Sequence, residues 1–292
     1  MFLIFINDLP SVVNSPCKLF ADDLVIYRQI NNQEDQITLQ RDMDRLADWE
    51  SKWGMQFHPD KCEHIMITRK RKPLRTTYSL RGHALKTVES AKYLGVTITS
   101  KLDWKEHIEN TTKKASKTLG FLRRNLKNAA EKTRETAYKT LIRPQVEYCA
   151  GIWDPHTKEL TNRIEMTQRR AARFVLRRYH QTSSVNAMLD QLSWETLQVR
   201  RAKMRLILMF KAIHHLIAVD NHLYLRPLDT PTRQSHGLPF KHISTIQNYH
   251  RYSFYPRTVP LWNNLPAGIA EVRTVEGFKL ELAKHTIPAQ LI

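Results

Sequence analysis

"LFADDLVIYR", residues 19–28, is an apolar run that is interrupted by two adjacent carboxylates. Asp22 and Asp23 stand between residues that favour a buried strand on both sides. Adjacent aspartates are usually turn residues, because their side chains hydrogen-bond to the nearby backbone. The pattern therefore predicts a hairpin with both carboxylates at its tip. It leaves open whether they serve only the turn or also bind a metal ion.

The segments that follow this hairpin indicate a small α+β unit. Apolar residues at helical spacing predict a helix over residues 34–53, with Gly54 as its C-cap. Short β-rich runs are expected at residues 64–68, around the Arg81–Gly82 turn, and at residues 93–98. We therefore expect residues 1–100 to combine one helix with a small antiparallel sheet.

The remaining sequence is predicted to be mostly helical. Asp103 is expected to open a helix, with Glu106 completing a capping box. Further helices are expected over residues 131–152, with a bend or break at Pro144, over residues 158–178, over residues 194–217 after an N-cap at Ser193, and over residues 275–285. Residues 218–260 are rich in Pro, His and Tyr and are predicted to be dominated by loops.

Positive charge is concentrated in the middle of the chain, whose formal net charge is +18. Lys and Arg number 15 against 13 acidic residues in residues 1–104, 22 against 10 in residues 105–205, and 9 against 5 in the remainder. Six arginines lie on one side of the helix predicted at residues 158–178: Arg163, Arg169, Arg170, Arg173, Arg177 and Arg178. Three of them recur every seven residues and form a basic ridge suited to phosphates.

Composition excludes several classes of protein. No apolar run approaches the roughly 18–20 residues that a membrane span needs. The three cysteines, Cys17, Cys62 and Cys149, are far apart and form no C-x-x-C pair, which favours free thiols in an intracellular protein of the nucleus or cytoplasm. The basic ridge could bind a nucleic acid, or it could be no more than the solvated face of a helical interaction protein.

Several stretches in order along the chain resemble the reverse transcriptases of non-LTR (LINE-type) retrotransposons, in the jockey and chicken-repeat-like branch. They are "FLIFINDLP", "LFADDLVIYR", "FHPDKCEHIMITR", "AKYLGVTI" with "LDWKEHI", "LIRPQVEYCAGIWDPHT", "RIEMTQRRAARFV" and "YPRTVPLWNNLP". The resemblance implies an α+β fold, in which part of a polymerase palm precedes a mostly helical thumb. The expected divisions are the C-terminal half of the palm at 1–102, a basic thumb-like domain at 103–180, and a helical C-terminal region at 181–292.

The same resemblance implies roles for individual residues. Phe20-Ala21-Asp22-Asp23 matches the metal-binding x-A-D-D motif, so that Asp22 would bind catalytic Mg²⁺ ions and Asp23 would support them. Lys61 matches a lysine that would protonate or neutralise the leaving pyrophosphate, and Tyr93-Leu94-Gly95 matches the region that grips the primer. The implied activity is RNA-directed DNA polymerisation by two-metal catalysis. The implied partners are an RNA template and a DNA primer, or an RNA/DNA hybrid, with neither a membrane nor a small-molecule cofactor.

The sequence also departs from the family pattern. A further metal-binding aspartate, the fingers and a Gln-Gly-Ser-type segment would all precede Met1 in the family. We therefore expect this chain to be a polymerase fragment that is inactive alone and poorly soluble. The alternative is a nucleic-acid-binding module without catalysis, which uses the basic helices of residues 105–205.

Overall fold

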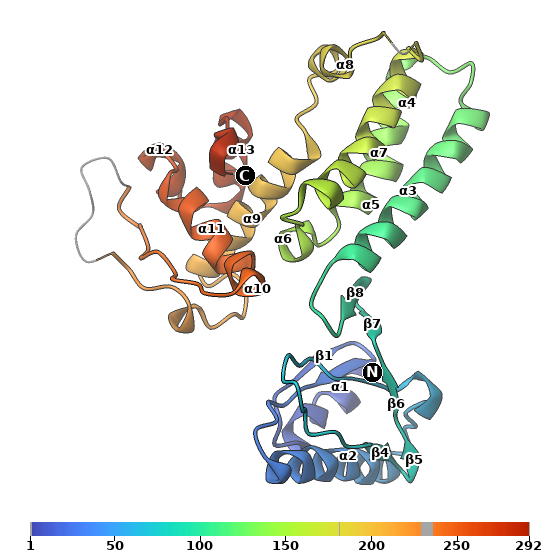
Figure 1. Cartoon of the computed structure of the whole chain (residues 1–292), viewed down its shortest axis with the longest axis vertical. Coiled ribbons are helices and arrows are strands. Elements are labelled where there is room, and N and C mark those ends of the chain that lie inside the picture. Colours follow the sequence, from blue (N-terminus) through green and yellow to red (C-terminus); the bar gives the residue numbers. More distant parts are fainter. Residues whose placement is uncertain (1, 181, 229–235, 292) are drawn as a thin grey trace. The chain divides into compact units, whose positions relative to one another are not determined.

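The computed structural model describes residues 2–180, 182–228 and 236–291, and divides the chain into two compact units. Unit 1 runs from Met1 to Glu106 and unit 2 from His107 to Ile292. Figure 1 shows that unit 1 combines short strands with helices, whereas unit 2 is built from helices. The expected α+β fold class is confirmed.

Unit 1 contains two helices and eight short strands among its described residues. They are α1 (Phe2–Ile6), β1 (Cys17–Phe20), β2 (Asp23–Ile26), α2 (Gln33–Trp53), β3 (Glu63–Ile65), β4 (Ser79–Leu80), β5 (His83–Ala84), β6 (Lys86–Val88), β7 (Ser90–Tyr93) and β8 (Val96–Thr99). The pairs β1–β2, β4–β5 and β7–β8 are antiparallel, and β3–β6 is parallel. The strands thus form four two-stranded ladders, where the sequence predicted one antiparallel sheet.

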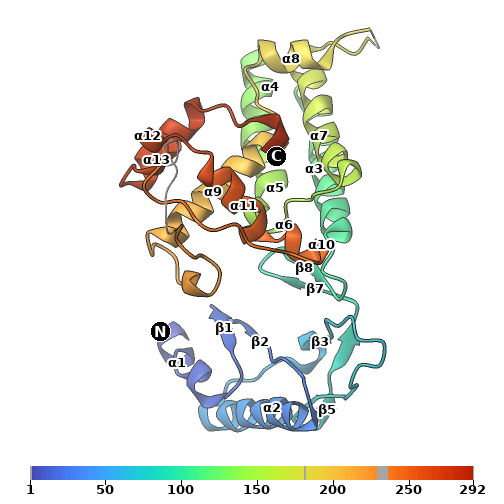
Figure 2. The same cartoon turned by 60° about the vertical axis from the view of Figure 1, so that its left-hand side comes forward.

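Helix α2 confirms the helix predicted at residues 34–53. The Asn32 side chain accepts a hydrogen bond from the backbone N–H of Asp35, whose own side chain accepts from the backbone of Asn32. Gly54 ends the helix in the left-handed conformation, with φ of 66°. The buried face of α2, which includes Leu46 and Trp49, packs into the core of unit 1. Figure 2 shows α2 lying along one side of this unit.

Two carboxylate contacts attach the segment before the carboxylate hairpin to α2; the Asp42 carboxylate is buried, and that of Asp8 is exposed. Asp42 accepts hydrogen bonds from the backbone N–H groups of Asn14 and Ser15, at 2.8 and 2.9 Å. Trp49 Nε1 donates to Asp8 Oδ1 at 2.9 Å. These contacts fix the chain immediately before β1, so the helix determines where the hairpin begins.

Two of the predicted β-rich runs differ from the structure. The run at residues 93–98 is divided into β7 and β8 by a turn at Leu94 and Gly95, whose φ angles are 45° and 82°. Positive φ at both central residues is the requirement of a type I′ hairpin turn. The run at residues 64–68 forms a strand only over Glu63–Ile65. The hairpin predicted around Arg81–Gly82 is confirmed as β4–β5.

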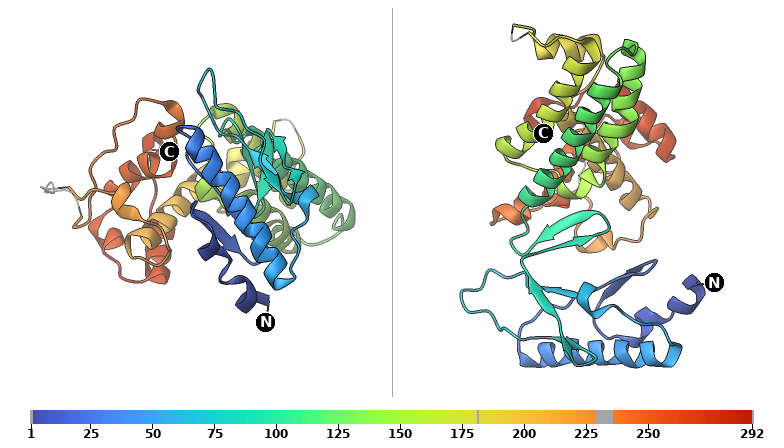
Figure 3. Two further views of the ribbon diagram at one scale, coloured as in Figure 1. Left: turned by 90° about the horizontal axis from the view of Figure 1, so that it is seen from below. Right: turned by 90° about the vertical axis from the view of Figure 1, so that its right-hand side faces the viewer.

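Most helices of unit 2 follow one another through short connections, but α9 and α10 are separated by residues 214–247. Helix α3 begins in the last residues of unit 1. They are α3 (Lys105–Asn125), α4 (Glu131–Ala137), a π-helix (Tyr138–Ile142), α5 (Arg143–Glu147), α6 (Ala150–Trp153), α7 (Lys158–Leu176), α8 (Val185–Gln191), α9 (Leu197–Ile213), α10 (Asn248–Arg251), α11 (Phe254–Asn263), α12 (Ala267–Ala270) and α13 (Val275–Lys284). Figure 3 shows the same helices from two further sides.

The helical predictions are largely confirmed, with two corrections. The break predicted at Pro144 occurs, and a π-helical turn precedes it because proline cannot donate the next backbone hydrogen bond. The helix expected after Ser193 begins later: Thr196 is the N-cap of α9, whereas Ser193 has a φ of 52° in the preceding turn. Glu106, expected to cap α3, accepts a hydrogen bond from Ser90 Oγ instead.

The segment predicted to be dominated by loops contains most of α11. The two prolines of α11, Pro256 and Pro260, argued against a helix in the sequence, yet Pro260 lies inside the helix. Tertiary packing outweighs this defect, because Trp262 of α11 is fully buried against the α9 and α13 side chains Phe210 and Phe278. The terminal helix predicted at residues 275–285 is confirmed as α13.

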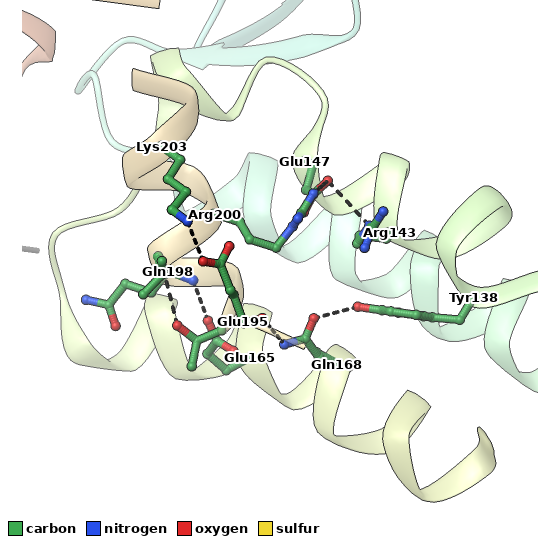
Figure 4. A network of polar contacts seen from close by, with 11 residues as sticks. Tyr138, Arg143, Glu147, Glu165, Gln168, Glu195, Gln198, Arg200 and Lys203 are labelled. Atoms are coloured by element: carbon green, nitrogen blue, oxygen red, sulfur yellow. Dashed lines mark hydrogen bonds and ion pairs between the residues drawn. The ribbon is translucent and has the colours of Figure 1, made fainter. Parts of the chain in front are cut away.

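A polar network joins the π-helix and α5 to α7 and α9 (Figure 4). The hydroxyl of Tyr138 donates to Gln168 Oε1 at 2.8 Å, and burial raises the pKa of this tyrosine well above its ordinary value. Gln168 Nε2 donates in turn to the backbone oxygen of Glu195 at 2.9 Å. Arg200 of α9 donates through Nη2 to Glu147 at 3.0 Å. These buried pairs fix how the helices of unit 2 pack.

Candidate metal-binding hairpin and nucleic-acid surface

The hairpin of β1 and β2 displays the two aspartates at its tip, as the sequence predicted. Phe20 pairs with Asp23, so Ala21 and Asp22 form a two-residue turn. Ala21 has a φ of 51°, a conformation that costs a residue with a Cβ about 1–2 kcal/mol. Asp22 therefore lies in the turn itself, and Asp23 is the first residue of β2.

Both aspartates are exposed and have no cationic partner among the described residues. Carboxylate oxygens are the ligands that Mg²⁺ takes from proteins. The pair fits part of a Mg²⁺ site, although the described residues hold no cluster of three or more His, Cys, Asp or Glu that could enclose a metal ion.

The structure brings the β7–β8 turn close to this tip. Burial and the negative charge of Asp23 raise the pKa of Tyr93 above its ordinary value. Because such a charge effect falls off with distance, Tyr93 and Asp23 lie near each other. Tyr93 is directly followed by Leu94 and Gly95 in the turn. Tyr93, the first residue of the stretch expected to grip a primer, is thus within electrostatic reach of Asp23.

Two other residues expected at this site, Lys61 and Phe20, differ in how they lie relative to the carboxylates. Lys61 is exposed in a 3-10 turn over Pro59–Lys61, and within the described chain it forms no ion pair with Asp22 or Asp23. Phe20 keeps 62% of its surface exposed, so its ring is available at the hairpin tip.

The expected arginine ridge on α7 is only partly available to a ligand. Arg163 pairs with Glu109 at 2.6 Å, and Arg177 donates to the backbone oxygen of Lys127. Arg177 also ends the helix in the left-handed conformation, so it no longer continues the α7 face. Arg170 remains exposed, as does Arg178, whereas Arg169 and Arg173 are half-buried.

Sequence reasoning missed a second basic surface in unit 2. Arg123, Arg124 and Lys127 lie at the end of α3 and line a cleft together with Tyr179. A signal was present, because three cations within five residues follow the last buried apolar residue of the helix, Leu122. Only the tertiary structure brings Tyr179 to the same place.

The structure also describes no helix with both the length and the apolar character needed to cross a membrane. All three cysteines, which lie within the described residues, are free, as predicted.

Comparison with known proteins extends these observations. Residues 1–98 match the family model of the reverse transcriptase (RNA-dependent DNA polymerase). The chain is 26% identical over 222 residues to a probable RNA-directed DNA polymerase from transposon BS of Drosophila melanogaster, covering 72% of this chain and 24% of that protein. It is 25% identical over 140 residues to the RNA-directed DNA polymerase from mobile element jockey of Drosophila melanogaster, covering 46% of this chain and 15% of the relative.

For a third relative, the match covers a larger share of the relative's own length. It is a retrovirus-related Pol polyprotein from a type-1 retrotransposable element of Nasonia vitripennis, 27% identical over 208 residues, covering 64% of this chain and 58% of the relative. The chain thus spans less than two thirds of each of these proteins. No solved structure matches it. The carboxylate hairpin lies inside the matched family region, and the similarity to named polymerases continues beyond it. The comparisons thus confirm the resemblance to the reverse transcriptases of non-LTR retrotransposons.

Proposed function

We propose that this chain supplies the carboxylate hairpin and the helical nucleic-acid-binding part of an RNA-directed DNA polymerase. The observation that carries the proposal is the unpaired Asp22–Asp23 tip beside Tyr93, inside the region that matches the reverse transcriptase family. Asp22 and Asp23 would hold Mg²⁺ there, and the bound ion would supply activation of a primer hydroxyl and stabilisation of the leaving pyrophosphate. The substrates are an RNA template and a DNA primer, or their hybrid, and the protein works inside the cell, in the nucleus or cytoplasm.

The residues have separate roles in this proposal. Asp22 and Asp23 hold Mg²⁺, and Lys61 neutralises the leaving pyrophosphate when substrate brings it to the site. The turn that follows Tyr93 positions the primer strand. Residues 1–102 then correspond to the C-terminal half of a palm, residues 103–180 to a thumb-like domain, and residues 181–292 to a C-terminal region.

The isolated chain is proposed to bind metal weakly and to extend no primer. The support is electrostatic: two dications held about 3.5–4 Å apart need carboxylates from more than one strand, because two side chains cannot balance four positive charges. The β1–β2 tip offers two aspartates, and the part of the chain that the structure describes holds no group of three potential ligands.

Metal binding and primer extension test these points separately. Mn²⁺, used as a spectroscopic substitute for Mg²⁺, should bind the 292-residue chain weakly, and Asp22→Asn with Asp23→Asn should abolish this binding. Asp44→Asn with Asp48→Asn, a matched change at exposed positions of α2, should leave Mn²⁺ binding unchanged. Binding that survives the first pair of changes would show that the hairpin is not the metal site.

Primer extension by the wild-type chain should be undetectable on a primed RNA template at any Mg²⁺ concentration. Template-dependent incorporation of nucleotides that Asp22→Ala abolishes would overturn the proposal that the chain is inactive alone, while supporting the role of the hairpin.

A second function, nucleic-acid binding without catalysis, is favoured by the cations of unit 2. Residues 105–205 hold 22 Lys and Arg against 10 acidic residues. If these helices bind RNA or DNA, the logarithm of the affinity should fall linearly with the logarithm of salt, with a slope of about −0.7 to −0.9 for each phosphate contacted. A flat salt response in a filter-binding assay would argue against this function.

A further inference from the structure

A cleft of about 660 Å³ lies in unit 2, where the C-terminal ends of α3 and α7 meet the start of α4. Its lining includes five cationic residues and one partly exposed tyrosine: Arg123, Arg124, Lys127, Arg134, Arg177 and Tyr179. None of the described residues that line it is acidic. The volume falls within the range of about 300–1,000 Å³ that is typical of ligand pockets.

Two of the five cations have structural partners. Arg134 donates from Nε to the backbone oxygen of Val175 at 2.9 Å, and from Nη1 to that of Ala129 at 2.6 Å. Arg177 donates to the backbone oxygen of Lys127. Carbonyl groups at helix C-termini lack partners within the helix, so these arginines satisfy them. They hold the walls of the cleft in place and do not by themselves indicate a ligand.

The other three cations, Arg123, Arg124 and Lys127, do not satisfy backbone carbonyl groups of the described residues in this way. Arg124 and Lys127 form no side-chain hydrogen bond or ion pair with the residues that the structure describes. The guanidinium of Arg123 lies 5.2 Å from the ring centroid of Tyr179. Attraction to the C-terminal end of the helix dipole contributes about 0.3–1 kcal/mol for each cation, but it does not account for an aromatic ring beside them.

The ring of Tyr179 provides a second recognition element. Half of its surface, 50%, is exposed, although it contacts Arg123. Aromatic rings beside cations are the usual binding surface for single-stranded nucleic acids, since the ring stacks on a base while the cations hold the phosphates. A base inside a duplex is already stacked and cannot take this position.

We propose that this cleft binds a single-stranded segment of nucleic acid, with its phosphates held by Arg123, Arg124 and Lys127 and one unpaired base stacked on Tyr179. The inference rests on the proposed function, because it locates the nucleic acid that the polymerase relationship requires. The proposed nucleic-acid contact lies at the end of α3, whereas the sequence predicted it on the arginine ridge of α7. Arg163 of that ridge is neutralised by Glu109 and is less available to phosphates.

Removal of the cleft charges provides the first test. A fluorescein-labelled 12-nucleotide RNA is titrated with the full chain, and its fluorescence anisotropy is followed at several salt concentrations. Arg124→Gln with Lys127→Gln should weaken binding at least tenfold and reduce the salt slope by about 1.4, the loss of two phosphate contacts. The matched control is Lys113→Gln with Lys117→Gln, which removes two exposed charges from the same helix outside the cleft. It should weaken binding less than threefold.

The outcomes distinguish a failure of the cleft proposal from a failure of the proposed function. Equal losses in the cleft variant and the control would overturn the cleft while leaving nucleic-acid binding intact. A wild-type chain that binds no RNA at low salt would overturn the proposed function itself, and the cleft with it.

The stacking contact has its own test. Tyr179→Ala should weaken binding of the single strand by about fivefold or more, whereas Tyr179→Phe, which keeps the ring, should bind as the wild type does. A blunt duplex of the same length should bind both variants equally. A strand containing 4-thiouridine should also crosslink to the peptide that carries Tyr179 in the wild-type protein, which avoids any effect of mutation on folding. Crosslinks confined to α7 residues such as Arg170 would contradict the proposal.

Discussion

Asp154 is a single buried carboxylate surrounded by three arginines of unit 2. Arg201 Nε contacts its Oδ1 at 2.7 Å, Arg257 Nη1 contacts its Oδ2 at 3.3 Å, and Arg205 contacts the same oxygen. Arg201 and Arg205 are almost completely buried. Burial lowers the pKa of Arg205 to about 10, a shift that Asp154 opposes and Arg257 reinforces. The negative charge of Asp154 therefore offsets the cost of burying these arginine charges close together.

Asp154→Asn should destabilise unit 2 by about 3–5 kcal/mol, because it leaves buried cations without their counter-charge. The free energy of unfolding can be measured in urea by intrinsic tryptophan fluorescence, to which the neighbouring, fully buried Trp153 contributes. Asp190→Asn makes the same change at an exposed position on α8 and should alter stability by less than about 0.5 kcal/mol. Similar losses in both variants would contradict the role given to Asp154.

Asp42 should make the stability of unit 1 sensitive to acid. Burial alone would raise its pKa, but hydrogen bonds from Asn14 and Ser15 and the charge of Arg45 hold that pKa below its ordinary value. The folded state therefore binds a proton more weakly than the unfolded state. The stabilisation is fully present above the unfolded pKa, about 3.9, and is lost as the pH falls through the lower folded pKa.

Urea unfolding between pH 2 and pH 7 tests this. Asp42→Asn should lose stability at neutral pH, and its deficit relative to the wild type should shrink as the pH falls below about 4. Asp48→Asn, an exposed change on the same helix, should show no comparable deficit. A deficit for Asp42→Asn that is independent of pH would show that its charge is not the cause.

At the scale of the element, the tip of the β1–β2 hairpin is strained by Ala21, whose φ is 51°. Glycine adopts this conformation without steric cost, so Ala21→Gly should stabilise the hairpin by about 0.5–1 kcal/mol. Hydrogen exchange at the β1 and β2 amides should slow accordingly. The same substitution at Ala47, inside α2, should cost about 1 kcal/mol. Faster exchange in Ala21→Gly would mean that the turn is held by tertiary contacts of the alanine methyl group.

Elements with their own start and stop signals were predictable from the sequence. Helix α2 has a capping box and a C-terminal glycine, and the β4–β5 turn contains the Arg-Gly pair of a type I′ hairpin. The carboxylate tip was predictable in the same way, from two adjacent turn-forming aspartates between two strand-forming runs. Helix α11 was not predictable, because its two prolines argue against a helix and only packing against α9 and α13 supports it. The basic cleft depends on Tyr179 meeting the end of α3, a contact that no periodicity reveals.

At the scale of the whole molecule, unit 1 leaves a group of neighbouring apolar side chains exposed on α1. Unit 2 has a core that includes fully buried Phe210, Trp262 and Phe278. Unit 1 buries Leu46 and Trp49, but α1 leaves Leu3 and Ile4 exposed at 63% and 79%. Phe5 extends the same apolar surface to Trp53 at the end of α2, with ring centroids 5.9 Å apart. Contiguous exposed apolar surface of this kind favours association.

The isolated chain should therefore self-associate through unit 1 as its concentration rises. Leu3→Ser with Ile4→Ser should lower the sedimentation coefficient at high concentration towards that of a monomer, because it removes two exposed apolar side chains of α1. Leu280→Ser on α13 removes a side chain that is 65% exposed in unit 2 and should not change association, since scattered exposed leucines are normal. A wild-type chain that stays monomeric up to high concentration and unfolds in one cooperative thermal transition would contradict this expectation. Association that persists in the α1 variant would instead place the contact elsewhere, with Phe20 at the exposed hairpin tip as the next residue to change.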